Sequence, residues 1–548
     1  MFCWQCQETN QNRGCTAGGR CGKHSETANE MDRLTALLKG LALVLRNGGT
    51  PPTREEGRHI LQSLFATITN VNFVTADIAR LTGETEQFLN TRAQAHGITE
   101  PQIPEPGVQK IVDEDICSLC ELITYGLRGI AAYAEHAAVL GVEDDSLYAF
   151  FVRTLAELAD EAMNPDFSAT AKQERIGALI QRVQETGTMA VRAMELLDRA
   201  NTEHFGHPEI TPVRTDVGSR PGILVSGHDL ADLYELLEQT ADQGIDIYTH
   251  GEMLPANAYP RMKKFPHLVG NYGGSWFRQP EEFTAFNGPI LMTTNCIVPV
   301  RDAYRHRIFT TGVVGYPAVK HIADRPVGGH KDFSEIILMA KTCPPPSPLP
   351  APESCTQVHC EPLETLTVGF AHHQVLALAD RVVEAVRSGA IRRFIVMAGC
   401  DGRHPERSYF TEVAYRLPAD TVILTAGCAK YRYHRLPLGE IHGIPRVLDA
   451  GQCNDSYSLV RIAMALKEAF GLDDLNQLQI SFDIAWYEQK AVAVLLALLS
   501  LGVKGIRIGP TLPAFLSPTV LEYLGKTYDL RPITTADADI TEMMCGGN

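Results

Sequence analysis

The chain has no hydrophobic run long enough to cross a bilayer. Its longest apolar stretch, "AVAVLLALLSLGV" (Ala491–Val503), lies between Lys490 and Lys504. It falls short of the roughly 20 residues that a membrane helix needs. The opening residues are polar and rich in cysteine, unlike the apolar core of a signal peptide. We therefore expect residues 491–503 to form a buried core helix, and we expect a cytoplasmic protein with no membrane insertion.

Basic residues are also in short supply. The chain has 49 Lys and Arg against 65 Asp and Glu, which gives a formal net charge of −16. This balance argues against nucleic acid or an anionic membrane as the main partner, and it suits docking to a protein with a basic patch. Aromatic residues make up 7% of the chain and hydrophobic residues 45%, as in ordinary globular proteins. At 548 residues the chain is too long for one core, so two to four domains are expected.

Cysteine, in contrast, is abundant, with 14 residues. In a reducing compartment this number indicates metal ligation rather than disulfides. Cys117 and Cys120, at a predicted helix start, are expected to be structural. An iron–sulfur cluster is favoured for the four opening cysteines, because zinc modules usually carry two C-x2-C pairs and the second pair here is C-x5-C. Structural zinc and a group of unligated thiols remain the alternatives. The C-x2-C-x8-C-x5-C pattern consists of Cys3, Cys6, Cys15 and Cys21.

Residues 25 to about 212 show the apolar spacing of amphipathic helices. The first segment begins at Ser25 with early acidic residues and stops at Gly48–Gly49. Proline-bearing loops such as "TEPQIPEPG" separate the segments. The pattern predicts helical bundles, with further helices at 54–81, 116–140, 146–163 and 171–200.

The pattern changes at Pro221, where short apolar strands begin to alternate with helices or loops. The segments "GILVSG", "HDLADLYELLEQTADQG" and "IDIYTHG" are typical of a βαβ unit. A proline-rich crossing, "CPPPSPLPAPESC", interrupts the alternation, which resumes with "LTVGF" from Leu366 and continues to "GIRIG". We expect two doubly wound α/β domains after the helical one. The predicted domains are residues 1–215, 216–362 and 363–548.

Reactive side chains stand at the ends of these predicted strands. Ligands of open α/β sheets bind beyond the carboxyl ends of the strands, so residues there are expected to share one site. Thiolates favour soft metals, carboxylates favour hard ones and imidazole suits iron, so this donor set indicates a mixed, multi-iron centre. The alternative is that each residue has an independent structural role. The strand-end residues are His228, His250, Glu252, Cys296, Cys400, Cys428, Cys453 and Glu488.

Several segments together resemble the hybrid cluster protein family, also called hydroxylamine reductases. They are the opening cysteine pattern, "YTHGEMLPA", "LMTTNC", "AGCDG", "LTAGCAKYR", "GQCNDSYS" and "AWYEQKAVAVLL". The resemblance covers essentially the whole chain. It implies a helical N-terminal domain followed by two Rossmann-like domains, similar to the carbon monoxide dehydrogenase architecture.

The resemblance also implies two metal clusters. The short spacing of the four opening cysteines is similar to that of members with a [4Fe-4S] cluster. A second, hybrid [4Fe-2O-2S] cluster would have a persulfide on Cys400, and His250 would have no ligand role. The implied ligands of the hybrid cluster are His228, Glu252, Cys296, Cys400, Cys428, Cys453 and Glu488.

The activity that the resemblance implies is the reduction of hydroxylamine to ammonia and water. Electrons would pass from a donor redox protein through the opening cluster to the hybrid cluster. Glu252, Cys400 and Glu488 are expected to be catalytic, as is Lys490 if it is a cation or proton donor beside the cluster rather than a surface or helix-start lysine. The same cluster would serve the alternatives, which are nitric oxide reduction, protein trans-nitrosylation and redox sensing in nitrosative stress. A carbon monoxide dehydrogenase-like enzyme and a zinc protein are further alternatives.

Overall fold

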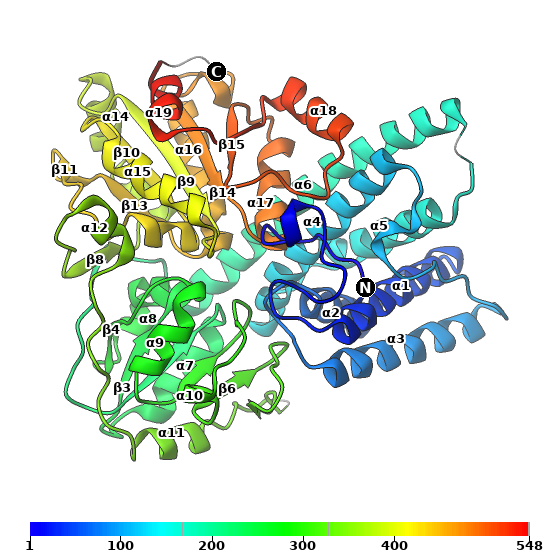
Figure 1. The fold of residues 1–548 in the computed structure, drawn as a ribbon, viewed down its shortest axis with the longest axis horizontal. Helices are drawn as coiled ribbons and strands as arrows, with labels where there is room; N and C mark the ends of the chain where they lie inside the picture. Colours follow the sequence, from blue (N-terminus) through cyan, green and yellow to red (C-terminus); the bar gives the residue numbers. More distant parts are fainter. Residues whose placement is uncertain (167, 327, 546–548) are drawn as a thin grey trace.

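The computed structural model describes residues 1–166, 168–326 and 328–545 (Figure 1). After the opening loop, the N-terminal part forms the predicted helices, drawn in blue and cyan in Figure 1. One of them, α2, begins with a capping box in which Thr53 and Glu56 satisfy each other's backbone N–H groups. The helices are α1 (Ser25–Asn47), α2 (Arg54–Ala66), α3 (Thr75–Ala95), α4 (Glu114–Val139), α5 (Asp145–Met163) and α6 (Ala169–Phe205).

The prediction of one helical segment over 54–81 is wrong. The helix α2 ends at Ala66 and α3 begins only at Thr75. Within the connecting loop, the Phe73 N–H donates to the Gly315 carbonyl at 2.9 Å, and Asn72 forms an isolated parallel bridge with Gly315. This contact spans more than 200 residues of sequence, so the local apolar spacing contains no sign of it.

Two six-stranded sheets follow, and every neighbouring pair in them is parallel. Counted along the chain, each sheet has the strand order 3-2-1-4-5-6 of a doubly wound fold, which confirms the predicted architecture. The first sheet contains β2 (Gly222–Ser226), β3 (Asp246–Thr249), β4 (Leu268–Asn271), β5 (Ile290–Met292), β6 (Ile308–Thr311) and β7 (Lys320–Ile322). The second contains β9 (Arg393–Gly399), β10 (Thr421–Thr425), β13 (Val447–Asp449), β14 (Ile480–Ala485), β15 (Ile506–Gly509) and β16 (Arg531–Pro532).

Both sheets are buried on both faces, and this explains their apolar sequences. Along β2, Ile223 and Val225 enter one hydrophobic core, whereas Leu224 between them enters another. Successive side chains of a strand point to opposite faces, so helices cover the sheet on each side. The helices that cover the two sheets include α7 (Leu230–Thr240), α9 (Gln279–Ala285), α11 (Ser334–Ala340), α15 (Ser408–Arg416), α16 (Ser456–Ala469), α18 (Pro518–Tyr528) and α19 (Ala536–Cys545).

The segment "LTVGF" does not belong to the second sheet, contrary to the expectation that the α/β alternation resumes there. It forms β8 (Thr365–Val368), which pairs antiparallel with β1 (Thr211–Arg214) in a separate two-stranded ribbon. Alternate residues of β8 are exposed, as in a strand that is covered on one face only. The predicted domain boundaries at 215/216 and 362/363 lie beside this ribbon and remain predictions.

The apolar segment at 491–503 is the buried helix α17 (Gln489–Ser500), as expected. It packs between α4 and α6 of the N-terminal bundle, although in the sequence it lies between β14 and β15 of the second sheet. Glycines permit this close approach: a Cβ on Gly129 would lie 2.4 Å from the Gln489 carbonyl oxygen, and one on Gly187 would lie 2.1 Å from that of Leu496. The start of α17 is thereby fixed against the bundle.

The close approach at Gly129 gives a stability prediction. Gly129→Ala should lower the thermal midpoint, because overpacking typically costs about 1–3 kcal/mol. The matched control is Gly83→Ala in α3, where a Cβ meets no atom within 4 Å. That variant should gain up to about 1 kcal/mol from helix propensity. Equal midpoints for the two variants would contradict the packing described for α17.

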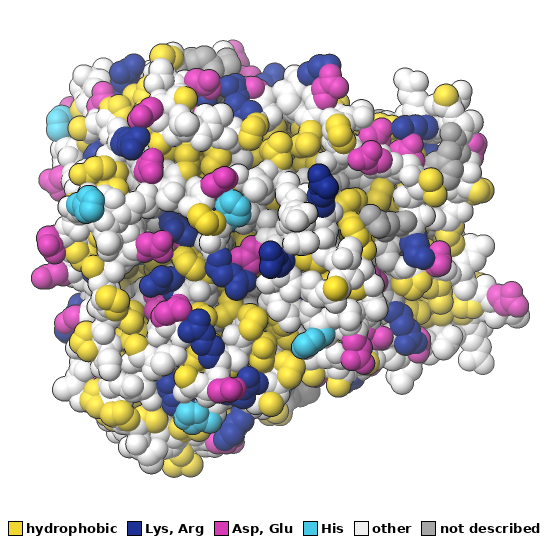
Figure 2. Space-filling view, viewed as in Figure 1, with side chains coloured by type: hydrophobic (Ala, Val, Ile, Leu, Met, Phe, Trp, Pro, Cys, Tyr) yellow, Lys and Arg dark blue, Asp and Glu magenta, His cyan; other side chains and the backbone are white. Residues whose placement is uncertain are grey.

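No helix in the described parts of the chain is long and apolar enough to cross a membrane. Figure 2 shows acidic and basic side chains interspersed over one face of the molecule. Hydrophobic side chains lie between them in small groups. On that face, neither sign of charge forms one continuous area.

Candidate metal centre

The strand-end residues meet where the order of each sheet reverses. In the first sheet this point lies between β2, followed by His228, and β5, followed by Cys296. In the second sheet it lies between β9, followed by Cys400, and β14, followed by Glu488. Crevices of this kind are the usual ligand sites of doubly wound sheets. The two sheets therefore present their ligand-binding edges to one shared site.

A glycine before Cys400 is required by the backbone. Gly399 has a φ of 106°, and a Cβ there would lie 2.0 Å from the Ala485 carbonyl oxygen. Only glycine adopts such a conformation without strain. The turn lets the Cys400 N–H donate to the Ala485 carbonyl at 2.8 Å. Gly427, before Cys428, has a φ of 89° and makes a similarly close approach to the Gly399 carbonyl.

His228, Glu252 and Cys453 form the tightest group of potential ligands. The His228 Nε2 lies 3.5 Å from Glu252 Oε2 and 3.6 Å from Cys453 Sγ. The Cys453 N–H donates to Glu252 Oε2 at 2.8 Å. Among the described residues, these are the only three His, Cys, Asp or Glu side chains whose ligand atoms all lie within 4.8 Å of one another. Cys428 also lies close to this group, because Glu252 is among its hydrogen-bonding neighbours.

Lys490 reaches into this group from the first turn of α17. Its Nζ donates to His228 Nε2 at 2.9 Å and to Asn295 Oδ1 at 3.0 Å, and the residue is buried. An ammonium group only donates, so Nε2 must be the unprotonated ring nitrogen of His228. The His228 Nδ1 lies 3.3 Å from Thr294 Oγ1, which accepts its proton. The nitrogen that faces the site therefore carries a free electron pair, as a metal ligand must.

The protonation states of His228, a borderline donor, and Glu252, a hard donor, agree with this geometry. Burial, with Lys490 adding to it, lowers the pKa of His228 to about 4, so the imidazole is neutral. Burial alone would raise the pKa of Glu252. The nearby Lys430 and Lys490 act against burial and hold the pKa of Glu252 below its usual range, so this carboxylate is ionised.

All four strand-end thiols have raised pKa values. Burial is the main cause, and it raises the pKa of Cys453 to about 12. Neighbouring acidic side chains and thiols raise the pKa of the other three further: Glu488 and Glu252 for Cys296, Glu488 and Cys453 for Cys400, and Glu252 and Cys296 for Cys428. Each predicted donor is thus an electrostatic neighbour of others in the set.

This donor set fits a cationic group. Four thiols, of which Cys428 and Cys453 are buried and Cys296 and Cys400 partly buried, and two buried carboxyl groups lie around the buried ammonium of Lys490. The acidic groups raise the pKa of Lys490 against the effect of burial. Thiols must lose their protons to bind metal, and a multivalent metal centre supplies the charge that makes this favourable. The buried Tyr133 hydroxyl lies beside Cys453 and lowers the pKa of that thiol by hydrogen bonding to it, against the effect of burial.

The four opening cysteines form a second group, in the loop before α1. Cys3 and Cys15 pair as an antiparallel bridge with N···O distances of 3.0 and 2.7 Å. Burial raises the pKa of Cys3 to about 12, and Cys21 is among its charged neighbours. Burial, with Cys21 and Cys3 beside it, also raises the pKa of Cys6. Cys6 and Cys15 are buried and Cys3 and Cys21 partly buried, and the role of the four as cluster ligands remains a prediction.

The opening loop contacts the strand-end site directly. The Gln7 N–H donates to the Tyr487 carbonyl at 2.9 Å, next to Glu488. Arg407, which has no exposed surface, donates to the Cys400 carbonyl at 3.0 Å and to Gln7 Oε1 at 3.2 Å. One buried guanidinium therefore bridges the two cysteine groups. Arg407 was not predicted from the sequence, because only residues that directly follow a strand were considered and Arg407 follows a turn.

Other residues considered from the sequence lie outside the site. His250 is buried, but its ring nitrogens face Ser226 Oγ and Glu282 Oε2, each at 2.9 Å, so neither is free for a metal. Cys117 and Cys120 are buried within α4, where the Cys117 Sγ donates to the Val108 carbonyl at 3.4 Å.

Comparison with known proteins adds the family. The model of the Prismane/CO dehydrogenase family matches residues 1–541. The chain belongs to this family. Two of its similar relatives are named hydroxylamine reductase: those of Nitratidesulfovibrio vulgaris and Chlorobaculum tepidum are each 54% identical, over 100% of both chains. This result confirms the resemblance drawn from the sequence motifs.

Solved structures of carbon monoxide dehydrogenases have a similar fold. Carbon monoxide dehydrogenase IV from Carboxydothermus hydrogenoformans matches with a TM-score of 0.57 over 97% of this chain and 89% of that one, at 14% identity. The carbon monoxide dehydrogenase from Thermococcus sp. AM4 also gives 0.57, over 99% and 91%. At such low identity the match concerns the fold alone, and it confirms the predicted architecture.

Proposed function

We propose that the protein is an iron–sulfur hydroxylamine reductase, in which the strand-end residues hold the reactive cluster. The observation that carries the proposal is the convergence of soft, borderline and hard donors at the shared edge of two sheets. Relatives named hydroxylamine reductase, 54% identical over their full length, support the assignment. The proposed ligands are His228, Glu252, Cys296, Cys400, Cys428, Cys453 and Glu488, for a hybrid [4Fe-2O-2S] cluster with a persulfide on Cys400.

The reaction takes up two electrons and two protons: hydroxylamine loses its N–O bond and leaves as ammonia and water. The bound iron would supply the electrons and Lewis acidity. The chain must supply the protons and exclude bulk water. Lys490, donor-only and buried, is the cation placed to protonate or hold a leaving oxygen. With His228 Nε2 holding a metal, Lys490 would no longer donate to that nitrogen and would have an N–H free for the substrate.

Glu488 has a positioning role as well as a proposed ligand role. Its side chain caps α17 by accepting the Lys490 N–H at 2.8 Å. One carboxylate group thus fixes the helix start that carries Lys490. Glu252 likewise accepts the Cys453 N–H with Oε2. A hard carboxylate on iron can dissociate to open a position for substrate, so Glu252 is the proposed labile ligand.

The opening cysteines are the proposed site of a [4Fe-4S] cluster that relays electrons. A single zinc ion, with Zn–S bonds of about 2.3 Å, would hold its sulfurs about 3.8 Å apart. Among the residues that the structure describes, no three opening sulfurs lie within 4.8 Å of one another. This spacing favours a larger cluster over zinc. Contact of the loop with Tyr487 and Arg407 supports electron transfer to the strand-end site.

Cys6→Ser tests the relay. The variant should lose iron from the opening cluster and slow turnover driven by a protein donor, while the seven strand-end residues stay intact. The measurement is iron content together with turnover by a protein donor and by a small chemical reductant. Cys120→Ser, another buried cysteine, is the control. Unchanged donor-driven turnover in Cys6→Ser would contradict the relay role.

Steady-state turnover of the purified holoenzyme tests the function itself. With a chemical reductant, hydroxylamine should disappear as ammonia appears in equal amount. Stoichiometric capture of nitric oxide without turnover of hydroxylamine would instead support the sensor or trans-nitrosylase alternative. Turnover of nitric oxide to nitrous oxide, with none of hydroxylamine, would support the nitric oxide reductase alternative.

A further inference from the structure

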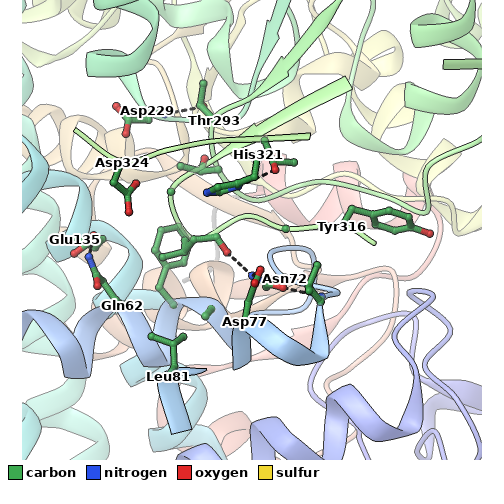
Figure 3. Close-up of a pocket in the computed structure, with 18 of the residues that line it drawn as sticks. Gln62, Asn72, Asp77, Leu81, Glu135, Asp229, Thr293, Tyr316, His321 and Asp324 are labelled. Atoms are coloured by element: carbon green, nitrogen blue, oxygen red, sulfur yellow. Dashed lines mark hydrogen bonds between the residues drawn. The ribbon is translucent and has the colours of Figure 1, made fainter. Parts of the chain in front are cut away.

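A cavity of about 650 Å³, lined by both polar and apolar side chains, lies between the N-terminal helices and the first sheet (Figure 3). In Figure 3, Gln62, Asp77 and Leu81 come from the helices below it, while His321 and Asp324 come from the sheet side above it. Arg80 and His321 are exposed, so this end of the cavity faces solvent. The cavity reaches from the surface toward the strand-end site.

The inner end of the cavity lies against His228. Thr294, which lines the cavity, accepts the His228 N–H at 2.8 Å. His136 of α4 also lines it, and its ring stacks on that of His228 with centroids 6.3 Å apart and an angle of 20°. Both side chains thus line the cavity and contact a proposed cluster ligand.

At the inner end of the cavity, His136 has a ring nitrogen whose hydrogen-bonding capacity is unsatisfied. The residue is only 8% exposed, and its Nε2 has no hydrogen-bond partner among the described residues. A buried polar atom without a partner is costly unless something outside the chain satisfies it. His136 thus offers a hydrogen bond at the floor of the cavity, beside His228.

The walls offer hydrogen-bond acceptors in excess. Asp77, Glu135, Asp229 and Asp324 line the cavity, and within the described residues none is ion-paired with a basic side chain. The cations Arg325 and Lys331 are already bound, both to Asp232 of α7 and Arg325 also to Glu235, while Arg80 is bound to Glu84. Burial raises the pKa of Glu135 to about 7, so its carboxyl group can also donate, whereas the carboxylates of Asp77, Asp229 and Asp324 only accept. The walls therefore favour a small molecule that donates hydrogen bonds.

We infer that this cavity is the inlet for a small hydrogen-bond donor of the hydroxylamine class, and that His136 Nε2 is its last contact before His228. The inference rests on the proposed function. Hydroxylamine donates through both N–H and O–H groups, whereas nitric oxide has no hydrogen to donate. The walls therefore select for the first of the two candidate substrates.

The test uses the holoenzyme, reduced beforehand and mixed with hydroxylamine in stopped flow. Val139, which lines the cavity and is 37% exposed, is replaced by Trp to obstruct the inlet. The second-order rate constant for oxidation by hydroxylamine should fall about tenfold or more, with iron content unchanged. Leu338→Trp, at a 63% exposed site outside the cavity lining, is the matched control and should match the wild type.

His136 is tested by a pair of variants. His136→Phe keeps a ring but removes the nitrogen, and it should raise KM for hydroxylamine about tenfold at similar kcat, the effect of one hydrogen bond. His136→Gln, which restores a polar group, should recover most of the loss. A purely structural role would not produce this split and rescue.

The outcomes separate the inference from the function. A wild-type holoenzyme that hydroxylamine does not oxidise would reject the proposed function, and the inlet with it. Wild-type activity that Val139→Trp and His136→Phe both leave unchanged would reject the inlet alone.

Discussion

Replacing Glu252 by glutamine should lower kcat for hydroxylamine at least about 100-fold, the upper range for loss of a supporting group at a metal site. The substitution keeps the size of the side chain but removes the charge of a carboxylate that is buried and ionised. The amide is also a poor metal ligand, so the proposed labile position is lost. The opening cluster should remain, because Cys6 and its neighbours are untouched.

The matched control is Glu282→Gln. Glu282 is also a buried carboxylate near the strand ends, but it accepts from His250 and from the Gly274 N–H rather than from Cys453. Its substitution should cost much less activity. If both variants lose activity equally, general polarity of the crevice, and not ligation by Glu252, would explain the effect.

Lys490→Met should have the second large effect. The variant should lose the strand-end iron, and its turnover should fall at least about 100-fold, as expected when a general acid is missing. Removing the ammonium deprives the thiols and carboxylates of the site of one buried cation, a change that typically costs about 3–5 kcal/mol. It also removes the donor that faces His228 at 2.9 Å.

Lys490→Arg separates the two roles of the lysine. This variant keeps the charge and should retain iron, yet it should turn over slowly, because a guanidinium does not release a proton. The control Lys504→Met changes a lysine outside α17 that takes no part in the site. Full activity in Lys490→Met with normal iron content would show that Lys490 merely starts the helix.

The meeting point of the candidate ligands was predictable from the sequence, because ligands of open α/β sheets bind beyond the carboxyl ends of the strands. Short apolar strands followed by Gly-Cys at 399–400 and 427–428 are a local signal, and parallel strands bring such ends together by geometry. The structure brings these side chains close, whereas their binding of iron remains a prediction. The opening cysteines were equally visible, because their spacing lies within 21 residues.

Long-range packing accounts for what the sequence did not reveal. The position of α17 depends on Gly129 and Gly187, about 300 residues away from it, and Arg407 contacts Gln7 across 400 residues. The apolar spacing of α17 indicated only that it is buried. For His136 a signal did exist, since "YAEHAA" puts a glutamate and a histidine among alanines in a buried stretch of α4.

Iron analysis combined with EPR spectroscopy tests the central claim most directly. The account predicts eight irons in each chain, four in the opening cluster and four at the strand ends, and two distinct EPR signals as the protein is oxidised or reduced. Four irons with a single signal, or zinc in place of iron, would contradict it.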